Sequence, residues 1–310
     1  MEDLNALSLD ALWTALVDAP RLRTLLSLAR DEDLAQVGDV TSMFMVPPDA
    51  RAGAAVRSRG AGVVAGLPAV PVVLEVFQVA GTASLTWTPR MADGEPCGAG
   101  DVLGVLAGSL RAILAVERTL LNLLGRLSGI ATLTRCYAQL VAGTSARICE
   151  TRKTTPGWRA AEKYAVRCGG GWLHRIGLHD AMLVKDNHIA GLSAPAMTER
   201  VAAAAALARS RVPLRFVEVE VDDLDQLASL LRLPAGVVDM ILLDNMTPDT
   251  LRAAVAQRDA SGRPVLLEAS GGIDRSTVRA VAETGVDRIS VGALTHSAPV
   301  LDLGLDIDAT

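Results

Sequence analysis

Cysteine is scarce in this 310-residue chain, and the few cysteines present do not form pairs. The four residues, Cys97, Cys136, Cys149 and Cys168, lie far apart, and no two of them have the CxxC spacing. This dispersion argues against a zinc site and against a disulfide framework, because both need cysteines at close and regular intervals. The thiols are therefore predicted to be ordinary core or surface groups.

Long apolar runs and clusters of basic residues are also lacking. Glycine and proline interrupt apolar stretches such as residues 62–77 before they reach the roughly 20 residues that a membrane-spanning helix needs. Residues 1–20 are acidic with helically spaced leucines, which is not the pattern of a secretion signal, and we expect a cytoplasmic protein. A formal net charge of −5 without basic runs argues against nucleic acid as a partner.

Lysine is the third scarcity. Among the 30 Lys and Arg residues, only Lys153, Lys163 and Lys185 are lysines, and all three lie in one segment. Lysine is a compact ammonium on a flexible stem whereas arginine is a planar fork, so the remaining lysines could mark places where arginine does not serve. We interpret Lys153 and Lys185 as functional and Lys163 as a solvated surface charge. Chance clustering and a codon preference for arginine are the alternatives.

What the chain does contain is an alternation of short aliphatic runs and helical segments from about residue 146 onward. Six runs are expected to be strands, namely RICETRK, AMLVKDN, LRFVEVEV, DMILLDN, PVLLEAS and DRISVGA. Between them, Thr247 followed by Pro248 is typical of a helix start, and Gly285 of a helix end. This order predicts successive strand and helix units with a parallel sheet, in an α/β barrel domain over residues 119–297.

Polar or small residues stand at or just past the end of each predicted strand. Because the strands of an α/β barrel present their C-terminal ends on one face, where such barrels hold their active sites, we expect these clusters to converge. They are Arg152 with Lys153, residues 185–188, Glu220, Asp244 with Asn245, residues 270–272 and residues 292–296.

Residues 1–118 follow a different pattern, typical of a small α+β domain, which the C-terminal tail 298–310 is expected to join. The sequence of this part alone does not indicate its function. Residues 111–141 read as a long amphipathic helical stretch that joins the two parts of the chain. We expect an interruption of this helix near Ser128 and Gly129.

The candidate site residues divide into three chemical groups. Cations suit an anionic substrate, and paired arginine forks suit carboxylates. Carboxylates suit Mg²⁺ held together with phosphates. Turns ahead of helices suit a phosphate. The cationic group contains Arg118, Arg152, Lys153, His174, Arg175 and Lys185. The carboxylates are Glu220 and Asp244. The turn residues are Ser270, Gly271, Gly272 and Gly292. A substrate with a carboxylate, a metal-bound diphosphate and a phosphate would use all three.

Seven segments resemble a known family in sequence and in order, from about Gly38 to the C-terminus. They are ERTLLNLLGRLSGIAT, TRKTTPGWRAAEKYAVRCGGG, HRIGLHDAMLVKDNHI, VEVEVDDLDQL, ILLDNM, LEASGGI and ISVGALTHSAPVLDLGLDI. They are similar to the signature segments of quinolinate phosphoribosyltransferase, or nicotinate-nucleotide pyrophosphorylase (carboxylating). The resemblance implies an α/β protein, a type II phosphoribosyltransferase with an N-terminal sandwich domain and an incomplete, six-stranded α/β barrel.

The resemblance also implies a reaction and an assembly. The phosphoribosyl group of 5-phosphoribosyl 1-diphosphate would pass to quinolinate with decarboxylation, giving nicotinate mononucleotide, diphosphate and CO₂ on the route to NAD. Mg²⁺ would accompany the diphosphate substrate, and no organic cofactor is expected. The protein would be a homodimer or a larger homo-oligomer in which Arg118 of one subunit completes the neighbouring site.

Each candidate residue takes a role by its place in these motifs. The expected catalytic residues are Lys153, Lys185, Glu220 and Asp244. Arg152, His174 and Arg175 would hold the quinolinate carboxylates, Lys153 and Lys185 the phosphoribosyl diphosphate or the second carboxylate, and Glu220 and Asp244 the Mg²⁺–diphosphate and ribose hydroxyls. The turns at residues 270–272 and at Gly292 would cradle the 5-phosphate.

Two departures from the family pattern bear on this interpretation. Leu173 stands where the family usually has Asn before the His-Arg pair, and bulky Trp172 precedes it, which puts the support of His174 in doubt. We interpret the segment RLPAGV as a lengthened helix-to-strand loop between Glu220 and Asp244, with little consequence. His188 could either hydrogen-bond a loop backbone or contact a ligand, and the role of His179 is open.

Two alternative functions stay open from the sequence. One is a paralogue of the molybdenum-transport-associated type that acts on another substrate, and the other is a non-catalytic oligomeric scaffold. The presence of Lys153, Lys185, Glu220 and Asp244 favours the quinolinate enzyme, whereas Leu173 favours the paralogue.

Overall fold

The computed structural model describes residues 3–78 and 84–308, which form two compact units. Within the described residues, the parallel-sheet unit contains Asp3 and residues 136–154 and 171–296. The antiparallel-sheet unit contains the described residues of 4–135, residues 155–170 and residues 297–308. Helix α5 (Leu110–Leu140) contains both the division expected at residue 118 and the boundary between the two units at Arg135 and Cys136.

The parallel-sheet unit has the six strands that the sequence predicts. They are β6 (Arg147–Cys149), β7 (Met182–Val184), β8 (Val217–Val221), β9 (Met240–Asp244), β10 (Leu266–Ser270) and β11 (Arg288–Ser290), in the spatial order β6, β11, β10, β9, β8, β7. All of the paired neighbours are parallel. The edge strands β6 and β7 do not pair with each other within the described residues, so the sheet is an incomplete barrel.

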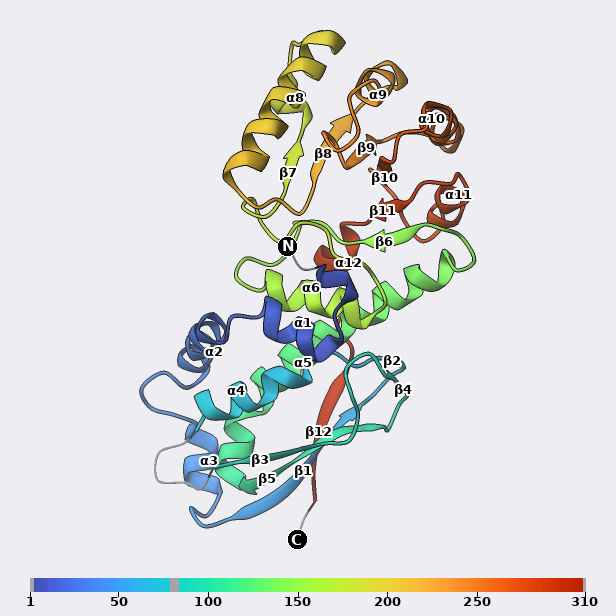
Figure 1. Ribbon diagram of the computed structural model, residues 1–310. Helices are drawn as coiled ribbons and strands as arrows, with labels where there is room; N and C mark the ends of the chain where they lie inside the picture. Colours follow the sequence, from blue (N-terminus) through green and yellow to red (C-terminus); the bar gives the residue numbers. More distant parts are fainter. Residues whose placement is uncertain (1–2, 79–83, 309–310) are drawn as a thin grey trace. The chain divides into compact units, whose positions relative to one another are not determined.

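Helices follow the strands and cover the outside of this sheet. The four longer ones, α8 (Ala194–Arg211), α9 (Leu224–Leu231), α10 (Pro248–Ser261) and α11 (Val278–Ala282), lie in succession along it (Figure 1). As predicted, Thr247 caps α10 by accepting a hydrogen bond from the Thr250 N–H, and Pro248 occupies the first turn. Two short helices, α7 (Asp186–Ile189) and α12 (Ala293–His296), follow β7 and β11. The RLPAGV segment lies in the loop between α9 and β9.

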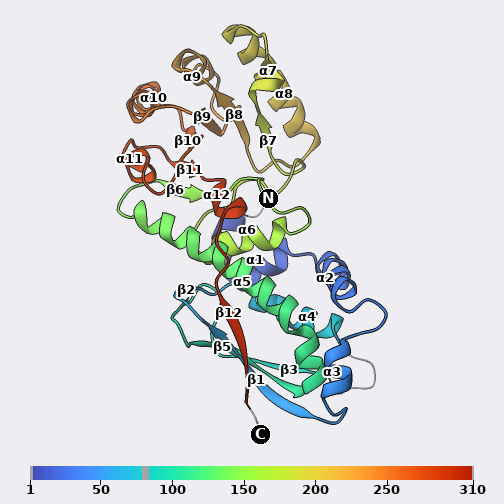
Figure 2. The ribbon, with the colours of Figure 1, turned by 180° about the vertical axis from the view of Figure 1, so that it is seen from behind.

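The antiparallel-sheet unit is built on a four-stranded sheet. Its strands are β1 (Arg51–Ser58), β3 (Thr86–Pro89), β5 (Val102–Ser109) and β12 (Leu303–Asp308), in the order β12, β1, β5, β3, and β2 (Gly62–Val63) pairs separately with β4 (Pro96–Cys97). The C-terminal strand β12 pairs antiparallel with β1, with Leu305 opposite Val56 (Figure 2). The remaining elements of this unit are the 3₁₀ turns η1 (Leu4–Ala6) and η2 (Leu67–Ala69) and the helices α1 (Leu9–Leu16), α2 (Ala19–Leu34), α3 (Val40–Met45), α4 (Val70–Val76) and α6 (Arg159–Cys168).

Two sequence-based predictions about helices are wrong. Helix α5 is not interrupted at Ser128 and Gly129 but continues to Leu140. Lys163 is not on the surface, because α6 is covered on most of its circumference and the Lys163 side chain is fully buried. The amphipathic pattern of a sequence does not show how many neighbours will cover a helix.

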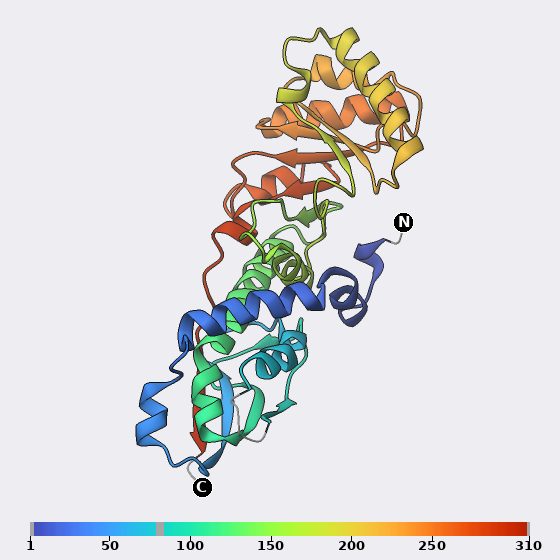
Figure 3. The same ribbon diagram turned by 90° about the vertical axis from the view of Figure 1, so that its left-hand side faces the viewer.

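Two glycines of α5 have a packing role instead, on the helix that Figure 3 draws in green with the C-terminal segment in red. A Cβ atom at Gly129 would lie 2.0 Å from the carbonyl oxygen of Pro299, and a Cβ at Gly125 would lie 2.7 Å from that of Leu301. The Gly125 carbonyl accepts a hydrogen bond of 3.0 Å from the Leu301 N–H. Glycine therefore lets the backbone that leads to β12 lie directly against the helix.

No helix in the described ranges combines the length and the apolarity that crossing a membrane requires.

The contact at Gly129 can be tested with Gly129→Ala. Alanine favours a helix, but its methyl group would overlap the Pro299 carbonyl, so we expect the free energy of unfolding to fall by roughly 1–3 kcal/mol. Denaturant unfolding measures the change. Gly60→Ala is the control, because a Cβ at Gly60 would meet nothing within 4 Å. Equal stabilities of the two variants would contradict the packing role.

Candidate active site

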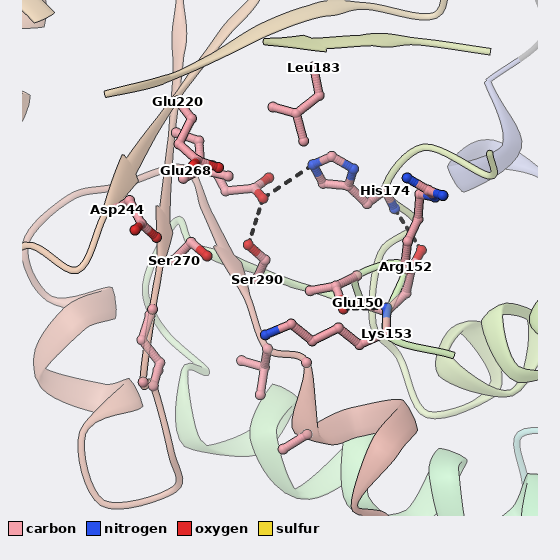
Figure 4. A pocket seen from close by; sticks show the side chains of 18 of the residues that line it. Glu150, Arg152, Lys153, His174, Leu183, Glu220, Asp244, Glu268, Ser270 and Ser290 are labelled. Atoms are coloured by element: carbon pink, nitrogen blue, oxygen red, sulfur yellow. Dashed lines mark hydrogen bonds and ion pairs between the residues drawn. The ribbon is translucent and has the colours of Figure 1, made fainter. Parts of the chain in front are cut away.

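One pocket of about 800 Å³ lies at the carboxyl ends of the parallel strands (Figure 4). Of the predicted site residues, all those in the parallel-sheet unit line this pocket. They are Arg152, Lys153, His174, Arg175, Lys185, Glu220, Asp244, Ser270, Gly271, Gly272 and Gly292. The expected convergence of strand ends thus holds for every one of these positions.

Two guanidinium groups form the cationic wall of the pocket. Arg175 is buried, and burial together with the nearby Arg152 lowers the pKa of its guanidinium. The Nε atom of Arg152 is buried and has no hydrogen-bond partner among the described residues. Two neighbouring cations without full compensation favour an anion between them, and the planar forks suit a carboxylate.

Lys153 is held at the pocket by its backbone. Its N–H donates to the Thr151 hydroxyl over 3.0 Å, and its carbonyl accepts from the Thr295 hydroxyl over 2.8 Å. Gly292 makes room for the side chain, since a Cβ at Gly292 would lie only 3.0 Å from Lys153 Cδ and 3.2 Å from His296 Nε2. The Lys153 ammonium can therefore reach the pocket because Gly292 has no side chain in its path.

A second lysine is paired with a carboxylate across neighbouring strand ends. The distance from Lys185 Nζ to Glu220 Oε2 is 2.5 Å, and the lysine side chain is 44% exposed whereas that of Glu220 is only 10% exposed. The Lys185 N–H donates to His188 Nδ1 over 2.8 Å. His188 thus makes the loop-backbone hydrogen bond, which was one of its two expected roles. Neither His188 nor the exposed His179 lines the pocket.

The opposite side of the pocket is formed by the ends of β9 and β10. Asp244 and Ser270 are register partners on these strands. Gly271 and Gly272 follow with φ angles of 99° and 58°, in the left-handed region that favours glycine. A turn of this kind exposes successive N–H groups, which can bind a phosphate.

Sequence reasoning missed a buried polar cluster at the floor of the pocket, where Glu150, Glu268 and Ser290 line it. Its members are Glu150, Glu218, Glu268, Arg288 and Ser290, all less than 9% exposed. A signal for three of them is present, since Glu218, Glu268 and Arg288 are charged residues in predicted strands that are rich in aliphatic residues. A charge in a strand that is covered on both faces needs a partner, so such positions point to an internal network.

His174 lies at the centre of this cluster. Its Nε2 atom is 2.9 Å from Glu218 Oε2 and 3.3 Å from Glu268 Oε1. Burial disfavours a charged His174 ring, whereas the neighbouring Glu268 and Glu218 raise the pKa of His174. The Arg175 N–H donates to His174 Nδ1 over 2.8 Å, so the proton lies on the Nε2 side, between the ring and the carboxylates.

The two carboxylates of the cluster differ in their partners. Burial alone would raise the pKa of Glu268, but His174 and Arg288 lower it to about 2. Glu268 accepts from Arg288 Nε over 2.9 Å and from the Ser290 hydroxyl over 2.7 Å. Glu218 lacks comparable donors, and burial, with Glu268 nearby, raises its pKa. Arg288 thus balances Glu268, and the raised pKa of Glu218 favours its neutral, protonated form.

The backbone of the His-Arg pair is also held by this cluster. Glu150 Oε1 accepts from the His174 N–H over 2.8 Å, and the Leu173 carbonyl accepts from Arg288 Nη2 over 3.1 Å. The Leu173 side chain is buried and, like Trp172, does not line the pocket. The doubt raised by Leu173 is therefore removed, because the support of His174 comes from buried carboxylates.

Two sets of residues in this unit could hold a metal ion. His174, Glu218 and Glu268 have ligand atoms within 4.8 Å of one another, but Arg288 already pairs with Glu268, and the Nε2 atom of His174 carries a proton. Glu220 and Asp244 line the open pocket and offer hard oxygen ligands, which fit Mg²⁺ that is carried in by a diphosphate.

Arg118 is the one predicted site residue in the other unit. It lies on α5 with 66% of its side chain exposed, and its closest acidic neighbour is Glu117 at 3.9 Å. It lines a separate pocket of about 380 Å³ within the antiparallel-sheet unit. Arg118 is not among the residues that line the pocket of the parallel strands.

Comparison with known proteins gives one family over nearly the whole chain. Residues 39–128 match the N-terminal domain of quinolinate phosphoribosyl transferase, and residues 130–306 match its C-terminal domain. The nicotinate-nucleotide pyrophosphorylase [carboxylating] of Mycobacterium leprae is 42% identical over 286 residues, which are 92% of this chain and 96% of the relative. A probable enzyme of that name from Methanothermobacter thermautotrophicus is 38% identical over 91% of this chain and 99% of its own.

Solved structures agree with this result. The nicotinate-nucleotide pyrophosphorylase from Francisella tularensis superposes with a TM-score of 0.81 at 36% identity, over 94% of this chain and 98% of its own. The enzyme of that name from Ehrlichia chaffeensis gives a TM-score of 0.79 at 34% identity, over 92% and 98% of the two chains. The chain belongs to the quinolinate phosphoribosyl transferase family.

Proposed function

We propose that this protein transfers the phosphoribosyl group of 5-phosphoribosyl 1-diphosphate to quinolinate with decarboxylation, giving nicotinate mononucleotide, diphosphate and CO₂. One observation carries the proposal: a single pocket holds a guanidinium pair, two lysines, two carboxylates and a glycine turn. These groups match the carboxylates, the diphosphate and the 5-phosphate of the two substrates.

Quinolinate is a dicarboxylate and suits the cationic wall. Its carboxylates would lie against Arg152 and Arg175, whose guanidiniums lack full compensation. Both ring nitrogens of His174 are engaged within the chain, so its contribution is to hold the Arg175 backbone in place. A fixed clamp places the pyridine nitrogen against the anomeric carbon, which lowers the entropic cost of the encounter.

Departure of diphosphate is the step that needs charge stabilisation. As the bond between the anomeric carbon and diphosphate breaks, positive charge grows on the ribose and negative charge on the leaving group. Lys153 and Lys185 would stabilise the latter, and Lys185 would share its ammonium between Glu220 and the substrate. Glu220 and Asp244 would hold Mg²⁺, which when bound neutralises diphosphate oxygens.

Decarboxylation then follows from the product of transfer. Once the pyridine nitrogen is quaternary, the bond to the adjacent carboxylate breaks, and its electron pair stays on the ring carbon beside N⁺. That carbanion takes up one proton to give nicotinate mononucleotide. No protein nucleophile and no organic cofactor are required for this step.

The two alternative functions lack support from the structure and from the relatives. The family members that match most of the chain are named for nicotinate-nucleotide pyrophosphorylase. The main argument for a paralogue was Leu173, whose side chain lies outside the pocket. A non-catalytic scaffold has no need to bring Lys153, Lys185, Glu220 and Asp244 together. The cytoplasmic location stays a prediction from the sequence.

The test is a reaction with the purified protein, quinolinate, 5-phosphoribosyl 1-diphosphate and Mg²⁺. We expect nicotinate mononucleotide and CO₂ in equal amounts, measured by chromatography and by release of label from the carboxylate. Nicotinate in place of quinolinate is the control. An inactive mixture with quinolinate, together with product from another acid, would overturn the proposal.

Lys153→Arg tests whether the ammonium itself is needed. The planar guanidinium is wider than the ammonium and must pass Gly292 and His296, so the charge is kept but misplaced. We expect kcat/KM to fall roughly 100-fold, the scale on which one stabilising donor acts. Arg252→Lys on the surface of α10, where Arg252 pairs with Asp249, is the control. Full activity of Lys153→Arg would show that any cation serves there.

The assembly is the finer part of the proposal. We infer a homodimer or larger homo-oligomer in which the exposed Arg118 of one subunit reaches the pocket of its neighbour. Support comes from the resemblance of the ERT segment to the family motif and from the exposure of the side chain.

Complementation tests this shared site. Arg118→Ala and Lys153→Ala are each expected to be nearly inactive. Subunits of the two variants that reassemble at random in a 1:1 mixture would regain about a quarter of wild-type activity, because half of the dimers are mixed and each has one intact site. Activity no higher than that of the separate variants would show that each site is built within one subunit.

A further inference from the structure

Asn245 has an unusual backbone at the edge of the pocket. It follows Asp244 at the end of β9 and lines the pocket, and its φ of 52° lies in the left-handed region. Ala35, with φ 45°, is the other non-glycine residue with positive φ in the described ranges. Asn tolerates this region better than most residues, and such conformations concentrate at functional sites.

The backbone of Asn245 connects the ends of two strands. Its N–H donates to the Ser270 carbonyl over 2.9 Å, beyond the last register pair, Asp244 with Ser270. The left-handed conformation turns the chain at this point, so that the Asn245 side chain faces the residues that follow β10. The strand end with the carboxylate and the turn with the glycines are thereby joined by one residue.

The side chain of Asn245 contacts both of these groups. Its amide Nδ2 donates to Asp244 Oδ2 over 2.6 Å. On the other side, a Cβ at Gly271 would lie 2.1 Å from Asn245 Oδ1 and 2.6 Å from its Cγ. The amide therefore fills the space that a side chain at position 271 would need, and Gly271 is required there both by this contact and by its φ of 99°.

We propose that Asn245 is a positioning residue that fixes the Asp244 carboxylate relative to the phosphate-binding turn at Ser270–Gly272. The inference rests on the proposed function, in which Asp244 serves the ribose and the Mg²⁺–diphosphate and the turn binds the 5-phosphate. Both groups belong to one substrate molecule, and the ribose sets the spacing between them. A residue that holds both protein groups therefore prepares the site for that substrate before it binds.

The chemistry of the contact explains why the residue is asparagine. Aspartate would place a second carboxylate beside Asp244 and has no donor to offer it. Alanine would lose the amide and would also be strained at positive φ. Glycine would accept the backbone conformation and lose only the amide, so it is the most informative substitution.

The test compares Asn245→Gly and Asn245→Asp with the wild type. Binding of 5-phosphoribosyl 1-diphosphate with Mg²⁺, and of quinolinate alone, is measured by calorimetry, and KM and kcat are measured for each substrate. For Asn245→Gly we expect a roughly tenfold weaker affinity for the diphosphate substrate, the scale of one hydrogen bond to a charged group, and unchanged affinity for quinolinate. Asn245→Asp should weaken the affinity for the diphosphate substrate more than Asn245→Gly does.

Two further variants separate positioning from general damage. Ala35→Gly relieves positive φ outside the pocket and should change neither affinity. Gly271→Ala should weaken binding of the diphosphate substrate strongly in the wild type and less in the Asn245→Gly background, because the amide that its methyl group would meet is gone.

The outcomes distinguish this inference from the proposed function. Selective weakening of the diphosphate substrate, with the coupling to Gly271→Ala, supports the inference. Wild-type affinity of Asn245→Gly, or equal weakening for both substrates, overturns it while the proposed function stands. A wild-type protein that binds no 5-phosphoribosyl 1-diphosphate overturns both.

Discussion

The buried ion pair between Arg288 and Glu268 is the interaction on which the pocket depends. Both side chains lie inside the sheet, 0% exposed for Glu268 and 8% for Arg288, and an unpaired charge there would cost several kcal/mol. The pair links β10 to β11. Glu268 also contacts Ser290 and His174, and Arg288 donates to the Leu173 carbonyl. The floor of the pocket and the position of the His-Arg pair therefore follow from one buried charge and its compensation.

The same arrangement separates satisfied charges from unsatisfied ones. At the floor of the pocket, Glu218, Glu268, His174 and Arg288 compensate one another, so this layer has little need of an external ion. Above it, Arg152 and Arg175 have weaker compensation, and Lys153 stands beside a glycine. The pocket thus offers an anion a set of donors that are already in place, and such preorganised donors stabilise charge that develops during a reaction.

Much of this site could be predicted from the sequence, for a definite reason. Parallel strands are short, aliphatic and separated by helices with recognisable caps, and their carboxyl ends meet on one face, so residues such as Lys153, Glu220 and Asp244 could be grouped before any coordinates. The resemblance to a family supplied the roles, which spacing alone does not give.

What the sequence did not predict depends on tertiary packing. Glu218 and Glu220 alternate with valines in VEVEV, and the pattern does not show that one reaches the floor and the other the open pocket. Lys163 was placed on the surface because a helix pattern does not show what covers it. The interruption expected at Gly129 was wrong because glycine there serves a close backbone contact. Each error concerns a neighbour that is distant in sequence.

The most direct test is a crystal structure of the protein with quinolinate and a non-reactive analogue of 5-phosphoribosyl 1-diphosphate with Mg²⁺. The account predicts both ligands in the pocket of the parallel strands, with quinolinate carboxylates on Arg152 and Arg175, the diphosphate beside Lys153, and the 5-phosphate at Ser270–Gly272. Quinolinate on other residues, or a phosphoribosyl group bound outside this pocket, would contradict it.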